Sequence, residues 1–555
     1  YLLLKHRFNL QTQTHSFHVH IQPVKLELRL LGAYGFSLFS IDSFQLKYFQ
    51  KFAFMKTIQK IFFLTFLFSA LFLSKILSAN VQPNIIIFLV DDMGAMDTSV
   101  PFIADKEGRP KKYPLNEMYH TPAMEKLSAG GCRFLNAYAM SVCSPSRVSI
   151  MTGQNSARHG VTNWINPHRN NDGKFGPADW NWEGIKKGTD TIPSLLRANG
   201  YRTIHVGKAH FGPLGSYAEN PINIGFDVNV GGCAWGQPGS YYGEKNFVGD
   251  RGQNPVPNLE RYFGKDIFLT DALTLEAKRE IKKCADEKKP FFLYMSHYAV
   301  HSPFQPDKRF IGRYGKYKSS TSKDWPAFAS MIESMDKSLS DILEYLDLLG
   351  IAEDTLVIFL GDNGSDARIL PVSEVEGPNT SKVANAAPLR GMKASKYEGG
   401  MRIPLIVSWA KPDKLNKNQQ AFPVLPGSFV NSMAVVYDLL PTIMSITGTS
   451  YDKSISDGES LCDAIAGSSN SDRLSKRKFL MHYPHEHRCR YFTVLRDGDW
   501  KLIRNYEDGS YELYNLKSDI SESRNLASDH PQKLNELKSE MDEILKSQKA
   551  KMPNL

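Results

Sequence analysis

The feature that most constrains the fold is a series of short, continuous apolar segments in which Ile and Val are frequent. The clearest are Ile85–Val90, Phe291–Met295, Leu356–Leu360 and Ile403–Val407, and Tyr201–Val206 is a weaker example. Apolar runs of five or six residues are typical of strands that are buried on both faces. We therefore expect these segments to form the centre of a sheet with no solvent-exposed side.

Segments with helical character separate these strands. They are Thr121–Ala129, Ile192–Asn199, Leu269–Lys283 and Ala327–Leu349. Strands that alternate with helices favour a mostly parallel sheet covered by helices on both faces. The predicted fold class is therefore α/β, with a large, mostly parallel sheet sandwiched by helices in a main domain of residues 80–475.

The sequence changes character from about residue 478. Short strands are predicted at Tyr491–Leu495, Lys501–Asn505 and Tyr511–Tyr514, and the Asp-Gly pairs between them are strong hairpin signals. A charged helix is predicted at Pro531–Ala550. Residues 476–555 are thus expected to form a small C-terminal α+β domain with an antiparallel sheet and one helix.

The first 79 residues are predicted to be absent from the mature protein. After Met55, Lys56 and Lys60 precede the apolar run Ile61–Leu73, and small residues follow at 77–79, which is the pattern of a secretory signal peptide at residues 55–79. The alternative is a membrane anchor, but an apolar run of 13 residues is short for a span of about 20. We expect residues 1–54 to be a spurious upstream extension, and the mature protein to be periplasmic or secreted, without a transmembrane anchor.

The net charge of the mature part gives no case for nucleic-acid binding. Residues 1–79 hold nine of the 67 basic and two of the 58 acidic residues, so the remainder has 58 basic and 56 acidic residues, a net charge of +2. Attraction for anions must then be local. The six cysteines match neither a zinc pattern nor a dense disulfide scaffold.

Polar residues follow four of the predicted strands directly. Asp91-Asp92 follows the strand Ile85–Val90, and Asp362-Asn363 follows Leu356–Leu360. Lys208 and His210 follow Tyr201–Val206, and His297 and His301 follow Phe291–Met295. Ligands bind beyond the carboxyl ends of strands in open parallel sheets, so these residues are expected to gather at one edge. The interpretation that Asp-Asp and Asp-Asn-Gly only make turns remains open for either pair alone.

The oxygen-rich set Asp91, Asp92, Asp362 and Asn363 suits Ca²⁺, or less well Mg²⁺, and does not suit zinc. Three carboxylates together without a cation would raise one another's pKa. A single hard divalent cation is therefore the expected cofactor.

Two further segments have the chemistry of an anion site. Cys143-Ser144-Pro145-Ser146-Arg147 precedes a helix predicted at about Pro145–Thr152, because Pro145 suits a first helical position, and helix N-termini attract anions. Cys143 could there be a thiolate nucleophile or a buried structural cysteine, which is how we interpret Cys132. Lys393 stands in a Gly-rich loop just before the strand at Ile403–Val407.

Taken together, these motifs resemble the type I, formylglycine-dependent sulfatases of the alkaline-phosphatase superfamily. The resemblance extends from about Pro83 to about His530 and includes C-x-P-S-R followed by Met-Thr-Gly, with NIIIFLVDDMG, GKAHFG, HSPF, GDNG and GMKASKYEGGMRIP in the family's order. The C-terminal ELYNL and NLA patterns match as well. We find no departure in the catalytic motifs.

The resemblance implies how the chain would act. Cys143 would be oxidised to formylglycine (3-oxoalanine) by a separate maturation enzyme, and its gem-diol would attack the sulfate ester, giving a sulfo-enzyme intermediate. Asp91, Asp92, Asp362 and Asn363 would bind one Ca²⁺, which also touches the modified Cys143. Arg147, Lys208 and Lys393 would clamp the sulfate, and His210 would act as base in sulfate release. His301 and Lys393 would together protonate the leaving alcohol, with the proton's source left open between them.

Specificity should come from residues around the sulfate. Candidates for substrate binding are Asn163, Trp164, His168, Arg169, Trp235, His485 and Arg488. The last two belong to the His-rich segment His482–Arg490, for which a solvated linker is the alternative interpretation; a zinc site at His485 and His487 is disfavoured because no further ligands stand out. His205 is interpreted as a core residue, and His297 as core or as support for the site.

The segment from Cys143 to Trp164 resembles exported bacterial enzymes that act on sulfated glycans, which favours a sulfated galactose or N-acetylgalactosamine unit as substrate. Two alternatives stay open. One is a phosphodiesterase or phosphonate hydrolase of the same superfamily, whose metals usually need several His ligands. The other is a non-catalytic binder of sulfated glycans.

Overall fold

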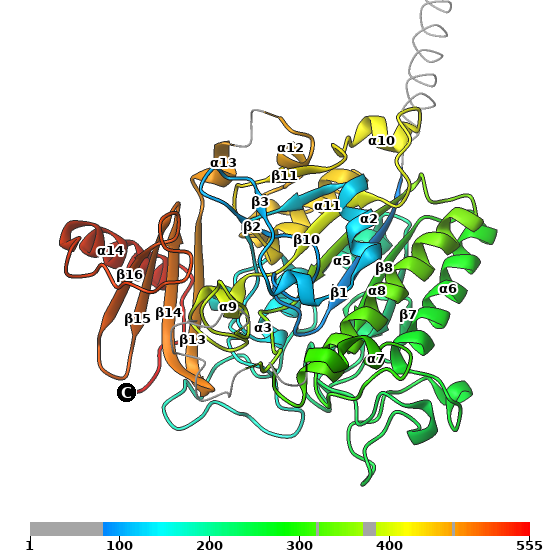
Figure 1. Ribbon diagram of the computed structural model, residues 1–555, viewed down its shortest axis with the longest axis horizontal. Helices are drawn as coiled ribbons and strands as arrows, with labels where there is room; N and C mark the ends of the chain where they lie inside the picture. The colour runs from blue at the N-terminus through cyan, green and yellow to red at the C-terminus, as the bar shows by residue number, and fades with distance from the viewer. Residues whose placement is uncertain (1–81, 318–320, 370–383, 469–471) are drawn as a thin grey trace, which may run out of the picture. The chain divides into compact units, whose positions relative to one another are not determined.

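The central strand of the fold is β1 (Asn84–Val90), in which Ile85–Val90 are all fully buried. In the computed structural model of Figure 1, β1 lies inside an eight-stranded sheet of order β11-β4-β10-β9-β1-β8-β6-β7. The structure describes residues 82–317, 321–369, 384–468 and 472–555, so the predicted upstream extension and signal peptide lie outside the described residues. The other strands of this sheet are β4 (Cys132–Phe134), β6 (Arg202–Gly207), β7 (Val228–Val230), β8 (Phe291–His297), β9 (Thr355–Gly361), β10 (Leu405–Trp409) and β11 (Ser428–Val430).

Most of the sheet is parallel, as predicted. Strands β1, β6, β7, β8 and β9 run in the same direction, whereas β10 is antiparallel to both β9 and β4. The apolar run at Ile403–Val407 correctly located this strand but did not predict its direction. The strand begins at Leu405, two residues later than predicted, because Pro404 precedes it. Because Leu405 pairs with Leu360, the start of β10 lies at the same sheet edge as the end of β9.

Successive side chains along a strand point to opposite faces of the sheet, so the sheet has two hydrophobic cores, one on each face. In β1, Ile85, Ile87 and Leu89 belong to one core, and Ile86, Phe88 and Val90 belong to the other. The first core also contains residues of α3 (Cys143–Thr152), α5 (Ile192–Ala198) and α11 (Leu439–Thr447). The second contains residues of α2 (Pro122–Gly130), α6 (Leu269–Glu287) and α8 (Trp325–Leu348). Helices therefore cover both faces, which confirms the predicted class.

Shorter elements connect these parts. They are the strand pairs β2 (Ile103–Ala104) with β3 (Pro110–Lys111) and β5 (Ala137–Tyr138) with β12 (Ala434–Val435), and the short helices α4 (Ser156–His159), α7 (Ile311–Tyr314), α9 (Glu398–Met401), α10 (Lys417–Ala421), α12 (Cys462–Ile465) and α13 (Asp472–Ser475).

The C-terminal region forms a second sheet of four antiparallel strands, coloured orange to red in Figure 1. Its strands are β13 (Lys478–His487), β14 (Cys489–Asp497), β15 (Trp500–Asn505) and β16 (Tyr511–Asn515), and α14 (Pro531–Ser547) packs against it. Phe479 and Met481 join the core of the main domain, whereas Leu480 packs with Leu537 of α14. The sheet is therefore covered on both faces. The His-rich segment is a strand hairpin and not a linker.

No helix in the described ranges is both long enough and apolar enough to span a membrane.

Candidate active site

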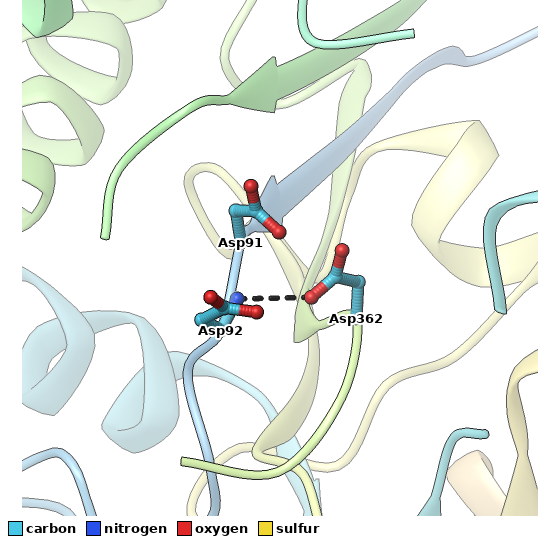
Figure 2. A group of neighbouring side chains, drawn as sticks. All are labelled: Asp91, Asp92 and Asp362. Atoms are coloured by element: carbon cyan, nitrogen blue, oxygen red, sulfur yellow. Dashed lines mark hydrogen bonds between the residues drawn. The ribbon is translucent and has the colours of Figure 1, made fainter. Parts of the chain in front are cut away.

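Three carboxylates meet where β1 and β9 end (Figure 2). Asp91 and Asp92 follow β1 and Asp362 follows β9, and each of the three offers an oxygen atom within 4.8 Å of the others. The backbone N–H of Asp92 donates to Oδ1 of Asp362 at 2.9 Å. These side chains and that of Asn363 are fully buried, so the predicted oxygen cluster exists and is shielded from solvent.

Each carboxylate of this cluster has a cationic partner. Lys208 Nζ lies 2.6 Å from Asp91 Oδ2, and Lys393 Nζ lies 2.6 Å from Asp92. Arg147 places Nε and one terminal nitrogen 2.8 Å from Asp362 Oδ2. The three predicted anion-binding cations are therefore brought together, each held by one carboxylate.

The antiparallel direction of β10 explains how Lys393 reaches the cluster. Lys393 precedes β10, whereas Lys208 follows β6, yet both ends lie at the same edge of the sheet. The backbone N–H of Lys393 also donates to the carbonyl of Ser365, in the loop after β9, at 2.8 Å. Two loops that are distant in sequence are thereby tied together beside Asp92.

Two oxygen atoms of the cluster remain without a hydrogen-bond partner in the described part of the chain. They are Oδ1 of Asp91 and Oδ1 of Asn363, both buried. An orphaned buried acceptor costs free energy unless a donor or a cation satisfies it. Burial also raises the pKa of Asp91 well above its ordinary value, although Lys208 opposes this effect. Oxygen ligands with unmet acceptors fit a hard divalent cation such as Ca²⁺ or Mg²⁺.

Helix α3 presents Cys143 and Arg147 on one face. The helix begins at Cys143 after the extended residue Val142, two residues earlier than predicted. Residues four apart in a helix are neighbours, so the spacing between Cys143 and Arg147 places the sulfur position one turn from the guanidinium that binds Asp362. Gly153 ends the helix with φ +69° and donates its N–H to the carbonyl of Ser149 at 2.9 Å, which explains the Met-Thr-Gly that follows the motif.

His210 lies against Cys143. Its Nδ1 is 3.4 Å from Sγ of Cys143, and its Nε2 is 2.7 Å from the carbonyl oxygen of Ile165. A carbonyl can only accept, so Nε2 holds the proton and Nδ1 faces position 143 with a free lone pair. Burial, and then Lys208, lower the pKa of His210 well below its usual value. The imidazole is therefore neutral at pH 7 and can accept a proton from position 143.

His301 and Lys393 approach the cluster from one side. His301 Nε2 is 3.7 Å from Asp92 Oδ2, and its Nδ1 is 2.9 Å from the carbonyl of Ser302. Burial, and then Lys393, lower the pKa of His301 to about 3. Burial is the largest single effect on Lys393 and opposes its protonation, but Asp92 and the other acidic groups around it together outweigh burial, so the pKa of Lys393 ends above its usual value.

A cavity of about 420 Å³ opens onto these groups. Cys143, His210, His301 and Lys393 line it. Of the predicted substrate-binding residues, four also line this cavity: Trp164, His168, Trp235 and Arg488. Trp164 packs against His487 with ring centroids 5.9 Å apart, and His168 packs edge-on against Trp235 at 5.0 Å.

Three predicted substrate-binding residues do not line the cavity. Asn163 is buried and bonds to the hydroxyl of Tyr483 at 2.9 Å. His485 is fully buried and bonds to Thr162 Oγ1 at 2.8 Å, so it supports the hairpin instead. Arg169 is exposed outside the cavity lining.

The other histidines of the predicted edge are packing residues. His205 is fully buried against the rings of Phe211 and Phe226, as predicted for a core residue. His297 is also buried, bonds to Ser338 Oγ at 2.9 Å and packs on Phe88. Cys132 is buried, as predicted.

Sequence reasoning missed three residues of the site. Ser296 Oγ accepts a hydrogen bond from Arg147 at 2.6 Å. Asp366 and Arg368 follow the Gly-Asp-Asn-Gly motif by a few residues, and Arg368 lines the cavity. Their place directly after a motif that predicts ligands was the available signal.

Comparisons with known proteins agree with this geometry. The family model described as Sulfatase matches residues 83–449, and the model described as N-sulphoglucosamine sulphohydrolase, C-terminal, matches residues 392–551. Together the two matched segments include every residue of the site described above.

Individual relatives match over most of their length. A sulfatase of Formosa agariphila is 27% identical over 509 residues, which cover 82% of this chain and 86% of that protein. An N-acetylgalactosamine-6-O-sulfatase of Bacteroides thetaiotaomicron is 27% identical over 540 residues, covering 84% of this chain and 93% of that protein. The crystal structure of Ps i-CgsB has a TM-score of 0.64 at 25% identity and covers 84% of this chain and 93% of that one.

Proposed function

Because the chain belongs to the sulfatase family, we propose that it hydrolyses the sulfate ester of a sulfated saccharide with a formylglycine made from Cys143 and one Ca²⁺ ion. The proposal rests on one arrangement. Position 143 opens a helix, faces the free lone pair of His210 Nδ1 at 3.4 Å and shares its cavity with Lys393, which binds the carboxylate cluster.

Formylglycine would supply a hydrated aldehyde as the nucleophile for sulfur, and the cation would supply positive charge beside the sulfate. Asp91, Asp92, Asp362 and Asn363 would hold the cation, since two of their buried oxygens lack another partner within the described ranges. Around the sulfate, Arg147, Lys208 and Lys393 provide N–H donors that are already fixed by ion pairs. Donors fixed in advance stabilise charge that develops in the transition state without reorganisation.

Proton transfer would involve both sides of the cavity. His210 is the base at position 143, because its Nδ1 is unprotonated and points there. His301 and Lys393 lie near Asp92 and are the two candidates to protonate the departing alcohol. Lys393 is the stronger candidate in this geometry because its ion pair with Asp92 keeps it charged.

We propose a galactose or N-acetylgalactosamine unit as the sulfated sugar. The name of the Bacteroides relative, an N-acetylgalactosamine-6-O-sulfatase, supports this choice. Trp164 and Trp235 give the cavity aromatic walls, which suit the apolar face of a sugar ring. The mature protein is proposed to act in the periplasm or outside the cell after removal of residues 55–79, with a maturation enzyme as its partner.

The test has two steps. Peptide mass spectrometry across Ser141–Arg147, on protein produced with a maturation enzyme, should find an aldehyde in place of the thiol of Cys143. The modified protein should then release sulfate from an aryl sulfate much faster than phosphate from the matching aryl phosphate, and Cys143→Ala should abolish the release. Faster phosphate release would favour the phosphoester alternative. Full activity of Cys143→Ala would contradict the proposal.

A further inference from the structure

One buried carboxylate, Asp366, lies behind the cavity lining and is shared by two arginines that line it. Asp366 Oδ1 accepts from Arg488 at 2.7 Å and from Arg368 Nε at 3.3 Å. Its Oδ2 accepts from Arg368 at 3.0 Å and from Arg488 at 3.1 Å. Two guanidinium groups thus face a single negative charge, and one positive charge is left over.

The described residues that line the cavity do not compensate that charge. Among the described residues, the lining contains no Asp and no Glu, whereas it contains Lys393, Arg368 and Arg488. Lys393 is already paired with Asp92. His487, which also lines the cavity, is neutral because burial and Arg488 lower its pKa to about 4. The unmatched charge therefore belongs to the pair of arginines.

Arg368 is the arginine that can turn toward a ligand. Its side chain is 30% exposed against 14% for Arg488, and the shortest contact with Asp366, at 2.7 Å, belongs to Arg488. It lies over the ring of Phe304 at 4.8 Å, which supports the guanidinium while leaving its edge open to the cavity.

Both arginines have backbone conformations that side chains rarely adopt. Arg368 has φ +49° and Arg488 has φ +59°. Such conformations are strained and persist where the surrounding structure imposes them, often at ligand sites. The two come from different parts of the fold, the loop after β9 and the β13–β14 hairpin, and they meet at Asp366.

From this arrangement we propose that the substrate has a second anionic group, a carboxylate or a second sulfate, which Arg368 binds while the first sulfate is hydrolysed. The inference rests on the proposed function and narrows its substrate class. Arg368 and Cys143 line the same cavity of about 420 Å³, so the second charge lies on the sulfated sugar or on its direct neighbour. A guanidinium binds both anions with a pair of parallel N–H groups.

The test compares the kcat/KM of three saccharides: monosulfated N-acetylgalactosamine, its disulfated counterpart, and a disaccharide of the monosulfated sugar with a uronic acid. We expect the wild type to prefer at least one doubly charged substrate by about tenfold, the effect of roughly 1.4 kcal/mol from a charge-assisted contact. Which of the two is preferred identifies the anion. The preference should shrink between about 0.02 and 0.2 M salt, because screening weakens exposed charges.

Substitutions at position 368 test whether Arg368 causes the preference for doubly charged substrates. Arg368→Gln should bring the ratio of kcat/KM values close to one, and Arg368→Lys, which keeps the charge, should give an intermediate ratio. Arg158→Gln is the matched control: Arg158 is 35% exposed, pairs with one carboxylate, Asp457, and lies outside the cavity lining, so the ratio should not change.

The outcomes separate the two proposals. If the wild type hydrolyses all three saccharides equally well, or if Arg368→Gln leaves the preference intact, the second-anion proposal is wrong and sulfatase function stands. If protein with formylglycine at position 143 releases no sulfate from the saccharides or from an aryl sulfate, the proposed function fails, and this inference fails with it.

Discussion

Replacing Asp362 by Asn should destabilise the calcium-free protein far more than an ordinary Asp→Asn change. Asp362 Oδ2 accepts two contacts from Arg147 at 2.8 Å, and both side chains are fully buried. The amide keeps the shape and can still accept the N–H of Asp92. It removes the negative charge, however, and it turns either an uncharged acceptor or a donor toward the guanidinium.

The size of the effect depends on which carboxylate remains near Arg147 after Asp362 is replaced. Its next carboxylate is Asp91, at 3.5 Å, which already pairs with Lys208 at 2.6 Å. Removing one partner of a buried ion pair costs about 3–5 kcal/mol, because the remaining charge is desolvated without compensation. We therefore expect the free energy of unfolding to fall by about that amount.

Guanidinium chloride unfolding in the presence of a chelator measures this difference. The control is Asp341→Asn, in which the carboxylate is 28% exposed and pairs with Lys337 at 2.6 Å, so it should cost less than about 1 kcal/mol. Calcium at a hundredfold excess over its Kd should stabilise the wild type by about 2.7 kcal/mol and the Asp362 variant by much less. Equal midpoints for wild type and Asp362→Asn without calcium would refute the assignment of this ion pair.

Three further predictions concern other parts of the protein. His210→Gln should lower kcat/KM on an aryl sulfate by about 10²–10⁴, at unchanged formylglycine content, because an amide can accept a hydrogen bond from position 143 but cannot take up its proton; wild-type rates would exclude His210 as the base. Burial raises the pKa of Asp97 to about 7. The folded carboxyl therefore keeps a proton that the unfolded one loses near pH 4, so stability should fall as pH rises from about 4 to about 7, and Asp97→Asn should flatten that part of the unfolding profile. Leu537→Ala in α14 should cost about 2–5 kcal/mol in urea unfolding, whereas Leu348→Ala, at 78% exposure, should cost almost nothing; equal costs would contradict the packing of α14.

The parts of the fold that could be predicted are those set by local sequence. The apolar run Ile85–Val90 specifies a doubly buried strand wherever it pairs, and the Asp-Gly turns after Asp497 and Asp508 specify hairpins. The direction of β10 could not be predicted, because five apolar residues pair equally well either way round. Its direction depends on the chain that leads to it, through contacts distant in sequence.

The same division holds for the candidate site. Residues adjacent to strand ends, such as Asp91 and Asp362, could be found because position in the strand fixes their place. Ser296 could not, because its role depends on Arg147, which reaches it from α3. Arg368 follows a motif that predicts ligands, but its sharing of Asp366 with Arg488 depends on a hairpin that is distant in sequence. His485 shows the reverse error: it is a polar residue in a plausible segment, but its ring is buried and its nitrogens contact Thr162 and the carbonyl of Asp172.

The balance of charge at the carboxylate cluster leads to a last prediction. Each of the three carboxylates has a cation within 2.6–2.8 Å, so without a metal the positive charges of Arg147, Lys208 and Lys393 are already balanced. A divalent cation held by the carboxylates competes for those oxygens and makes the cationic groups available, so cation and sulfate should strengthen each other's binding by the same factor. Isothermal titration of a Cys143→Ser variant with inorganic sulfate should show tighter binding in calcium than in chelator. Equal affinities would mean that the pairing in the cluster does not control access of the anion.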